Sequence, residues 1–266
     1  MTKAYFYLAG VVSILLFSTL TESDDKKWTL VFEDNFDSST LDSKNWAISH
    51  GNGCPELCGF GNKELQAYNK DNVKLKEGKL ILSAHYKQAM ERDYQAGKIT
   101  TEPMGGWKYG KFSVRAKLPK ALGTWPAIWM LPQDWSYGSW PKSGEIDIME
   151  HVGFEVDAVH GTIHTEAYNH SIKTHKGKEV IVKGATEAFH TYTVTWTKDV
   201  LIWDIDGQEY FRIPRQKTDT AKEWPFDQKF HLILNVAVGG TWGGLKGINN
   251  AEYPTAMEVD WVKVWQ

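Results

Sequence analysis

Short segments in which apolar and polar residues alternate, separated by turn signals, recur along the whole chain. A period of two is typical of half-buried β-strands, and no amphipathic helical period of comparable length competes with it. We expect strands at residues 28–32, 73–75, 80–82, 111–118, 127–131, 145–150, 158–164, 191–197, 202–205, 209–211, 230–238 and 257–265. The pattern predicts an all-β fold in which two antiparallel sheets stack as a β-sandwich, with any active site on an outer, concave face.

Residues 145–150, Glu-Ile-Asp-Ile-Met-Glu, place three carboxylates inside an apolar, strand-like segment. Side chains on a strand alternate between its two faces, so Glu145 and Asp147 share one face and Glu150 would fall on the other. A β-bulge at residues 148–149 would return Glu150 to the face of the other two acids. We therefore expect all three carboxylates to line one surface.

Three like charges this close cannot all stay ionised at unperturbed pKa values, so the acids are expected to hold at least one proton near neutral pH. One carboxyl group can then act as an acid and another as a nucleophile or base, which is what cleavage of a glycosidic bond requires. The alternatives are acids on a half-solvated edge strand, or acids that bind a metal ion. The apolar residues Ile146, Ile148 and Met149 favour the catalytic interpretation over a solvated edge.

The composition of the chain indicates which class of molecule it binds. The net charge is −3, and Lys and Arg are scattered among the acids, which argues against a nucleic-acid partner. The 13 tryptophans are unusually many, and several lie beside Gly or Pro, where flat indole faces can pack on sugar rings. Trp196, Trp203 and Trp261 fall in strand patterns and are expected in the core. A polysaccharide is therefore the expected partner, and the chain is expected to be a monomer.

The first 23 residues have the pattern of a secretory signal, a basic residue followed by an apolar stretch too short to span a membrane. We expect one catalytic domain at residues 24–266, secreted or periplasmic and free of the membrane after signal cleavage. In an exported protein, Cys54 and Cys58 are expected to form a disulfide. Two cysteines alone do not make a convincing zinc site, and thiol catalysis would need a nearby base.

Alternation also selects polar side chains on two further strands. In residues 111–118, Arg115 lies opposite the apolar face and is a candidate cleft residue. In residues 158–164, His160 and His164 share one face, and His164 could reach a substrate hydroxyl or the acid/base. Histidines four residues apart on a strand are separated by about 13 Å, so these two cannot ligate one ion directly. A surface or hydrogen-bonded histidine is an equally good interpretation of His160.

The segment Gly-Thr-Trp-Pro-Ala-Ile-Trp-Met-Leu-Pro at residues 123–132, followed by the acidic segment, resembles glycoside hydrolase family sixteen. In that family the bulged acidic pattern is typical of laminarinases and of some agar- and porphyran-degrading enzymes. Residues 61–66, Gly-Asn-Lys-Glu-Leu-Gln, and residues 235–242, Asn-Val-Ala-Val-Gly-Gly-Thr-Trp, look specifically like laminarinases. The resemblance spans nearly all of the mature chain and implies a concanavalin-like jelly roll with a concave substrate cleft.

The same resemblance implies an activity and its residues. The activity is retaining hydrolysis of internal β-1,3-glucosidic bonds in laminarin-type glucans. Glu145 matches the nucleophile, Glu150 the general acid/base, and Asp147 the carboxylate that holds the proton balance between them. Trp125 and Trp140 would stack on sugars in the negative subsites. The remaining positions that match the family cleft are Asn62, Glu64, Arg115, Trp129, His164 and Trp242.

Family members often carry a structural calcium on the face opposite the cleft, although catalysis itself requires no cofactor. The positions that match its ligands are Asn35, Gly78 and Asp260. Asn35 stands where laminarinases commonly place Glu, so the ligand set has one charge fewer. Lys63, where the family usually has Asn, is a second departure and lies next to a subsite position.

Other functions stay open at this stage. Within the class, the substrate could be mixed-linkage β-glucan or a red-algal galactan such as agar or porphyran. A sulfated galactan would favour several basic residues in the cleft, whereas the candidates here are mostly aromatic and neutral. A non-catalytic carbohydrate-binding sandwich would keep the tryptophans but would not need three crowded acids.

Overall fold

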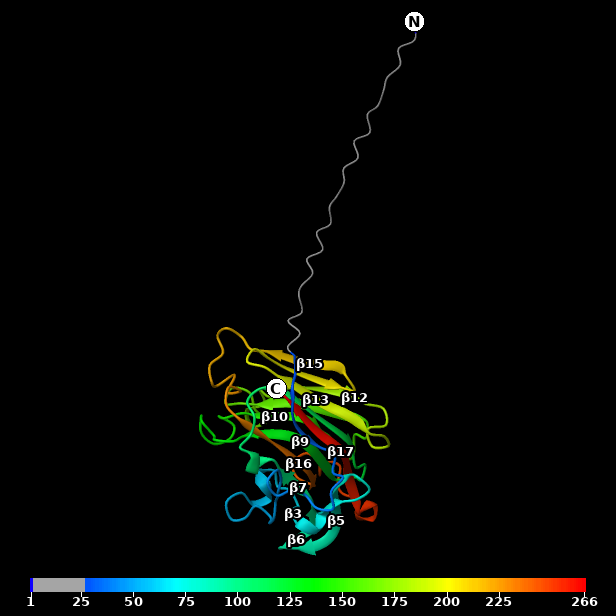
Figure 1. Ribbon diagram of the computed structural model, residues 1–266. Helices are drawn as coiled ribbons and strands as arrows, with labels where there is room; N and C mark the ends of the chain where they lie inside the picture. The colour runs from blue at the N-terminus through cyan, green and yellow to red at the C-terminus, as the bar shows by residue number, and fades with distance from the viewer. Residues whose placement is uncertain (2–26) are drawn as a thin grey trace.

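The computed structural model describes residues 27–266 together with Met1. The signal segment expected at residues 1–23 lies outside the described residues apart from Met1, and the proposed domain start at residue 24 does as well. The described residues form two β-sheets joined by loops and short 3₁₀ helices (Figure 1). The predicted all-β sandwich is confirmed. Within the described residues, no helix has the length and apolar character needed to span a membrane.

The larger sheet has ten strands in the order β15-β14-β13-β8-β17-β5-β6-β3, with β1 paired to β17 and β4 paired to β5. All of its pairs are antiparallel except β3 with β6. Its strands are β1 (Leu30–Asp34), β3 (Gln66–Tyr68), β4 (Val73–Leu75), β5 (Leu80–Ala89), β6 (Arg92–Ala96), β8 (Gly110–Lys117), β13 (His190–Trp196), β14 (Val200–Ile205), β15 (Gln208–Pro214) and β17 (Thr255–Trp265).

The smaller sheet has seven strands in the order β12-β11-β10-β9-β16-β7-β2, all antiparallel. Its strands are β2 (Ala47–Ile48), β7 (Lys98–Thr100), β9 (Thr124–Pro132), β10 (Glu145–Glu150), β11 (Ala158–His164), β12 (Lys176–Ile181) and β16 (Phe230–Val238). The 3₁₀ helices are η1 (Cys58–Gly61), η2 (Lys70–Asn72), η3 (Glu102–Met104), η4 (His170–Ile172) and η5 (Asn250–Glu252). The alternation pattern does not predict β2, β3, β6, β7 or β12, because these strands are short or carry mainly polar residues.

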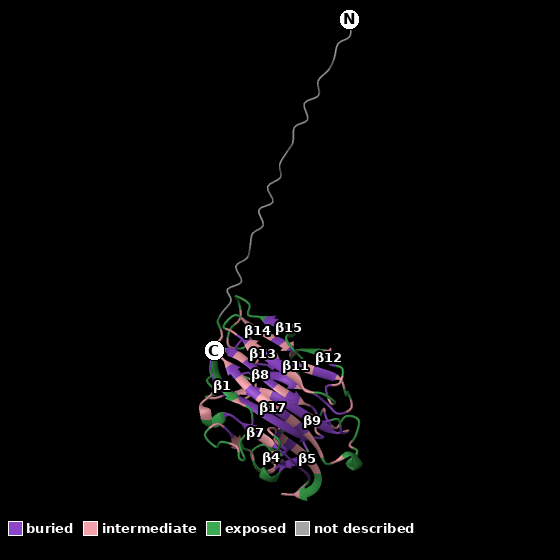
Figure 2. Cartoon of the chain, turned by 45° about the vertical axis from the view of Figure 1, so that its right-hand side comes forward, coloured by how far each residue is buried: buried purple, intermediate pink, exposed green. Residues whose placement is uncertain are grey.

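The core lies between the two sheets, where each strand contributes the apolar half of its alternating pattern. Phe112, Val114 and Ala116 of β8 are fully buried, as alternation predicts, and so are Trp196 and Trp203. Figure 2 shows the buried residues running along the strands and the exposed residues in the connecting loops. The buried apolar residues of both sheets form one continuous cluster, which supports a single domain over the described residues.

The expectation that Trp261 lies in the core is wrong. This tryptophan is only half-buried, and Lys263 Nζ lies 4.9 Å from the centre of its ring on the outer face of the ten-stranded sheet. The pairing of β17 with β8 shifts register between Val259 and Trp261. The extra residue of this bulge turns Trp261 outward and returns Val262 to the core, an effect that simple alternation cannot anticipate.

Candidate active site

The register of the seven-stranded sheet places the three acids on one face. On β11 the partners of the acids occupy alternate positions and therefore share a face. The pairs are Glu145 with His164, Asp147 with Thr162, and Glu150 with His160. The register shifts between Asp147 and Glu150 against β11, and between Asp147 and Met149 against β9. The predicted bulge is thus confirmed, and it is what returns Glu150 to the face of the other two acids.

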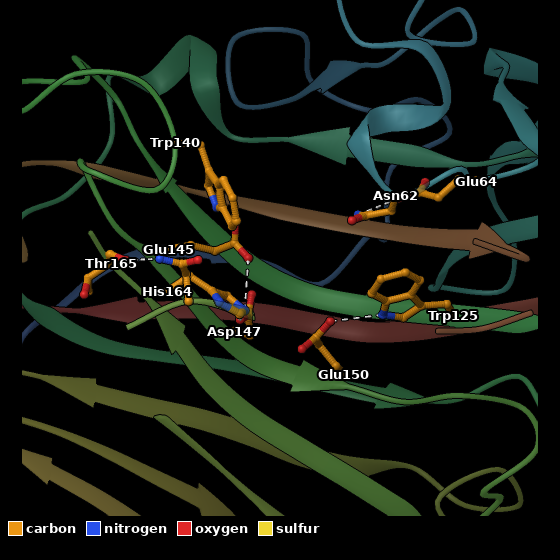
Figure 3. A network of polar contacts seen from close by, with 10 residues as sticks. Asn62, Glu64, Trp125, Trp140, Glu145, Asp147, Glu150, His164 and Thr165 are labelled. Carbon is orange, nitrogen blue, oxygen red and sulfur yellow. Dashed lines mark hydrogen bonds and ion pairs between the residues drawn. The ribbon is translucent and has the colours of Figure 1, made fainter. Parts of the chain in front are cut away.

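Two tryptophans hold the outer acids of this row. Trp140 Nε1 donates a hydrogen bond of 2.9 Å to Glu145 Oε2, and Trp125 Nε1 donates one of 3.0 Å to Glu150 Oε1. In Figure 3 the Trp140–Glu145 pair and the Trp125–Glu150 pair lie at opposite ends of the site, with Asp147 between them. Each indole N–H fixes one carboxylate oxygen, so the other oxygen of Glu145 and of Glu150 is not occupied by a tryptophan.

The middle acid is the most enclosed. Asp147 is 2% exposed and shares a hydrogen bond with Glu145 that lowers the pKa of Glu145 and raises the pKa of Asp147. His164 Nε2 lies 3.5 Å from Asp147 Oδ2 and 3.8 Å from Glu145 Oε1. Burial lowers the pKa of His164 to about 3, helped by the nearby His170 and His175, so its imidazole is neutral and supplies no charge to offset the acids.

Burial is the main cause of a raised pKa in all three acids. For Glu145 the charge of Glu150 adds to this effect, while hydrogen bonds from Trp140 and Asp147 oppose it. For Asp147 the charges of both glutamates raise the pKa further. For Glu150 burial is opposed by the hydrogen bond from Trp125. These directions agree with the expectation that the acids retain at least one proton near neutral pH.

The acids open into a cleft of about 430 Å³ on this face of the seven-stranded sheet. Five of the predicted substrate residues line the cleft with the three acids, namely Asn62, Glu64, Trp125, Trp129 and Trp140. Further lining residues that the sequence did not indicate include Phe60, Tyr68, Lys98, Trp135, His170 and Asn235. The cleft therefore presents mainly aromatic faces beside the crowded carboxylates.

The other three predicted substrate residues are not among those that line this cleft. His164 is buried beside the acids on the same face, as the cross-strand partner of Glu145, and contacts Asp147 and Glu145. Trp242 is partly exposed and packs edge-on against Trp125, with ring centres 5.5 Å apart, so it lies next to the cleft lining. The prediction for Arg115 is wrong.

Arg115 projects from β8 on the outer face of the ten-stranded sheet, where it pairs with Asp260 and stacks on the ring of Phe189. Alternation correctly separated its polar face from the core. It could not show that β8 belongs to the sheet opposite the cleft.

Asn235 and Lys98 show two different reasons why site residues escape sequence reasoning. Asn235 is a polar residue inside the apolar strand β16, and that contrast could have identified it. It accepts a hydrogen bond of 2.7 Å from Trp129 and donates one of 3.1 Å to the Tyr68 hydroxyl. Lys98 carries no such signal, because only the pairing of β7 with β16 brings it beside Asn235.

A charged pair forms one end of the cleft. Glu64 is buried and accepts hydrogen bonds from Gln66 Nε2 at 2.7 Å and from Asn62 Nδ2 at 3.1 Å. Burial raises the pKa of Glu64 and lowers that of Lys98, whose charge Glu64 and Glu145 help to stabilise. Lys98 Nζ lies 5.4 Å from the ring centres of both Tyr68 and Trp129. This end of the cleft therefore combines hydrogen-bonding groups with aromatic faces.

The predicted disulfide between Cys54 and Cys58 is present. It closes the loop that leads into η1, from which Leu57 and Phe60 reach the cleft. The disulfide thus anchors part of the cleft wall.

The residues that match the family calcium site do not form a convincing cation site. Of Asn35, Gly78 and Asp260, only Asp260 has a carboxylate, and this group is already paired with Arg115. Hard divalent cations prefer several oxygen ligands, usually with more than one charge among them. Calcium therefore enters no catalytic step proposed below.

We expect calcium to contribute little to stability. Adding EDTA, or millimolar calcium after EDTA, should move the melting temperature by less than about 2 °C, which corresponds to under about 1 kcal/mol for a domain of this size. Differential scanning calorimetry measures the shift, with magnesium as the control for ionic strength. A calcium-specific rise of several degrees would contradict this expectation and restore the family site.

Crowded carboxylates with raised pKa values, held between tryptophans on one face of a β-sandwich, are the groups that a glycoside hydrolase needs. The sequence pattern of glycosyl hydrolases family 16 matches residues 60–263, and the chain belongs to this family of glycoside hydrolases. It is 43% identical over 272 residues to a β-glucanase of Rhodothermus marinus, which covers 97% of this chain and 93% of that protein.

Solved structures agree with this assignment. The laminarinase of Rhodothermus marinus superimposes with a TM-score of 0.86 at 42% identity, covering 90% of this chain and 97% of that chain. A non-specific endo-β-1,3(4)-glucanase of the same family gives a TM-score of 0.84 at 40% identity, covering 91% and 95% of the two chains. The family resemblance inferred from the sequence motifs is therefore confirmed.

Proposed function

We propose that this chain is a retaining endo-β-1,3-glucanase that hydrolyses internal bonds of laminarin-type β-glucans. One observation carries the proposal: the bulge in β10 brings Glu145, Asp147 and Glu150 onto a single face of an aromatic cleft. The names of the relatives described above, a β-glucanase and a laminarinase, support the same substrate class.

The two outer acids have different roles in the reaction. Glu150 donates its proton to the glycosidic oxygen while Glu145 attacks the anomeric carbon, and the bond to the leaving sugar breaks. The product of this step is a glycosyl ester of Glu145. Glu150, now ionised, then takes a proton from water as the water attacks the same carbon and releases Glu145. Two inversions leave the anomeric configuration unchanged.

Hydrogen bonds from neighbouring side chains contact both outer acids. The hydrogen bond from Asp147 stabilises the ionised form of Glu145, as does the one from Trp140. Glu150 has a single stabilising side-chain hydrogen bond, from Trp125, in a buried environment that favours its protonated form. Burial raises the pKa of both glutamates, so the pKa shifts do not distinguish the two roles, and we assign Glu145 as the nucleophile and Glu150 as the acid from their match to the family motif.

The cleft lining favours a neutral glucan over a sulfated galactan. The charged residues of the lining are the three catalytic acids together with Glu64 and Lys98. Among the described residues that line the cleft, Lys98 is the only lysine or arginine, and it lies close to three aromatic rings. Mixed-linkage β-glucan is the second candidate, because one solved relative is described as a non-specific endo-β-1,3(4)-glucanase. We also propose that the enzyme acts as a monomer outside the cytoplasm, secreted or periplasmic, where the Cys54–Cys58 disulfide is stable.

A panel of polysaccharides tests the substrate. The purified protein should release reducing ends from laminarin, with weaker activity on lichenan and none on agarose, porphyran or carrageenan. Proton NMR of the first product should show the β-anomer before mutarotation. Galactan cleavage without laminarin cleavage, or an initial α-anomer, would contradict the proposal. Binding of laminarin without any release of reducing ends would instead indicate a carbohydrate-binding sandwich.

A further inference from the structure

Two acids of the catalytic row, Glu145 and Asp147, lie close to His164, an imidazole to which the hydrolytic mechanism gives no role. His164 Nε2 faces Asp147 Oδ2 at 3.5 Å and Glu145 Oε1 at 3.8 Å, and one ligand atom from each residue lies within 4.8 Å of the other two. We propose that Glu145, Asp147 and His164 form a binding site for a divalent transition metal such as Zn²⁺ or Cu²⁺, and that its occupation inhibits the enzyme. The inhibitory part of this inference rests on the proposed function.

The spacing of these atoms suits a single ion. Zinc binds imidazole nitrogen and carboxylate oxygen at about 2.0–2.2 Å, and tetrahedral angles then separate neighbouring ligand atoms by about 3.4 Å. The distances from His164 Nε2 to the two carboxylate oxygens exceed this value by only a few tenths of an ångström. The ligand atoms of Glu145 and Asp147 lie within 4.8 Å of each other, and side-chain rotations that bring these two atoms together would complete three coordination positions.

A second observation points to a ligand at this position. Within the described part of the chain, Asp147 Oδ2 is buried and has no hydrogen-bond partner, although the side chain is only 3% exposed. Buried polar atoms in folded proteins are nearly always paired. A buried carboxylate oxygen without such a partner, turned toward an imidazole nitrogen, is a ready metal ligand.

The surroundings determine which ion is favoured and how it enters. Glu145 and Asp147 line the cleft, so an ion can arrive from solvent and keep water in its remaining position. One imidazole and two carboxylates suit zinc and copper, and the usual order of affinities places copper above zinc. Calcium and magnesium, which prefer oxygen ligands alone, should bind poorly.

Occupation of the site would block hydrolysis directly. Trp140 holds Glu145 Oε2, so Oε1 is the oxygen available to attack the anomeric carbon. A metal ion bound to Oε1 would prevent this attack. The ion also occupies space in the cleft that the sugar needs. Inhibition should therefore be competitive with the glucan and reversible by EDTA.

The chain offers a matched control. Glu155, His160 and Glu179 form a similar cluster among the described residues, but its two glutamates are exposed and none of the three lines the cleft. His160→Gln removes the histidine of this surface cluster, and His164→Gln removes the histidine of the cleft cluster. The two variants make the same chemical change at different places.

Calorimetric titration of zinc chloride into the protein without substrate gives the decisive measurement. We expect one site in the wild type, an affinity at least about 10-fold weaker in His164→Gln, and an unchanged affinity in His160→Gln. Asp147→Asn keeps the shape of the side chain and should weaken binding to a similar extent. Equal zinc affinity in the wild type and in both cleft variants, or a loss confined to His160→Gln, would overturn the proposal.

Kinetics on the wild type keep the proposal testable even if the cleft variants do not fold. Zinc inhibition of laminarin hydrolysis must be competitive, and a non-competitive pattern would overturn the proposal. The binding measurement needs no glucan, so the two proposals fail separately. Zinc binding without laminarin hydrolysis contradicts only the proposed function, and hydrolysis without zinc binding contradicts only the metal site.

Discussion

Glu145→Gln is expected to lower kcat on laminarin by on the order of 10⁴-fold or more, because it removes the nucleophile of a two-step reaction. Glutamine has nearly the same shape, and its amide oxygen can still accept the hydrogen bond from Trp140. Binding of laminari-oligosaccharides, measured by calorimetry, should therefore stay close to that of the wild type. Rates are measured as release of reducing ends under single-turnover and steady-state conditions.

Glu258→Gln is the matched control for this experiment. Glu258 lies on β17, pairs with Lys117 on the outer face of the ten-stranded sheet, and is remote from the cleft. Its activity should stay within about twofold of the wild type, since surface substitutions of this kind cost about 0.5 kcal/mol or less. A Glu145→Gln protein that retained more than about 1% of the wild-type kcat would contradict the nucleophile assignment, because loss of a covalent nucleophile costs far more.

Glu150→Gln is expected to lower kcat/KM on laminarin by about 10²- to 10⁴-fold, the usual contribution of a general acid/base. Burial raises the pKa of Glu150, so the carboxyl group stays protonated to a higher pH than an ordinary glutamate. Wild-type kcat/KM should fall as the pH rises through this raised pKa, because the leaving group then loses its proton donor. Glutamine does not ionise, so the residual activity of the variant should lack this alkaline limb.

Two further measurements separate the roles of the acids. Trp125→Phe removes the hydrogen bond that lowers the pKa of Glu150, so the alkaline limb should move to higher pH. An aryl β-glucoside whose phenol leaves without protonation should restore the first step in Glu150→Gln but not in Glu145→Gln. The reverse result would exchange the two roles.

The local part of the site was predictable from the sequence. Alternation, together with one inserted residue between Asp147 and Glu150, is sufficient to place three acids on a common face, and the structure shows that bulge. The strands around the acids carry strong apolar patterns, so their existence follows from short-range information. The Cys54–Cys58 disulfide is equally local, since only four positions separate the two residues.

The non-local part was not predictable in the same way. Alternation assigns Arg115 to a polar face, but the sheet to which that face belongs depends on the pairing of β8 with β13 and β17. Lys98 reaches the cleft only because β7 pairs with β16, residues far away in the sequence. Trp261 turned outward through a bulge that its own segment does not signal. These errors share one cause, because strand partners are chosen by the packing of the whole sandwich.

The bulge in β10 also limits how this cleft can change over evolutionary time. If the same six residues paired as a regular strand without the bulge, Glu150 would exchange faces with the fully buried Met149 and carry a carboxylate into the apolar layer between the sheets. Burying an unpaired charge there would destabilise the fold at the same moment as the catalytic geometry was lost. An ancestor with the shorter acidic segment and a descendant with the longer one are therefore separated by a discrete insertion, which no gradual series of substitutions can replace.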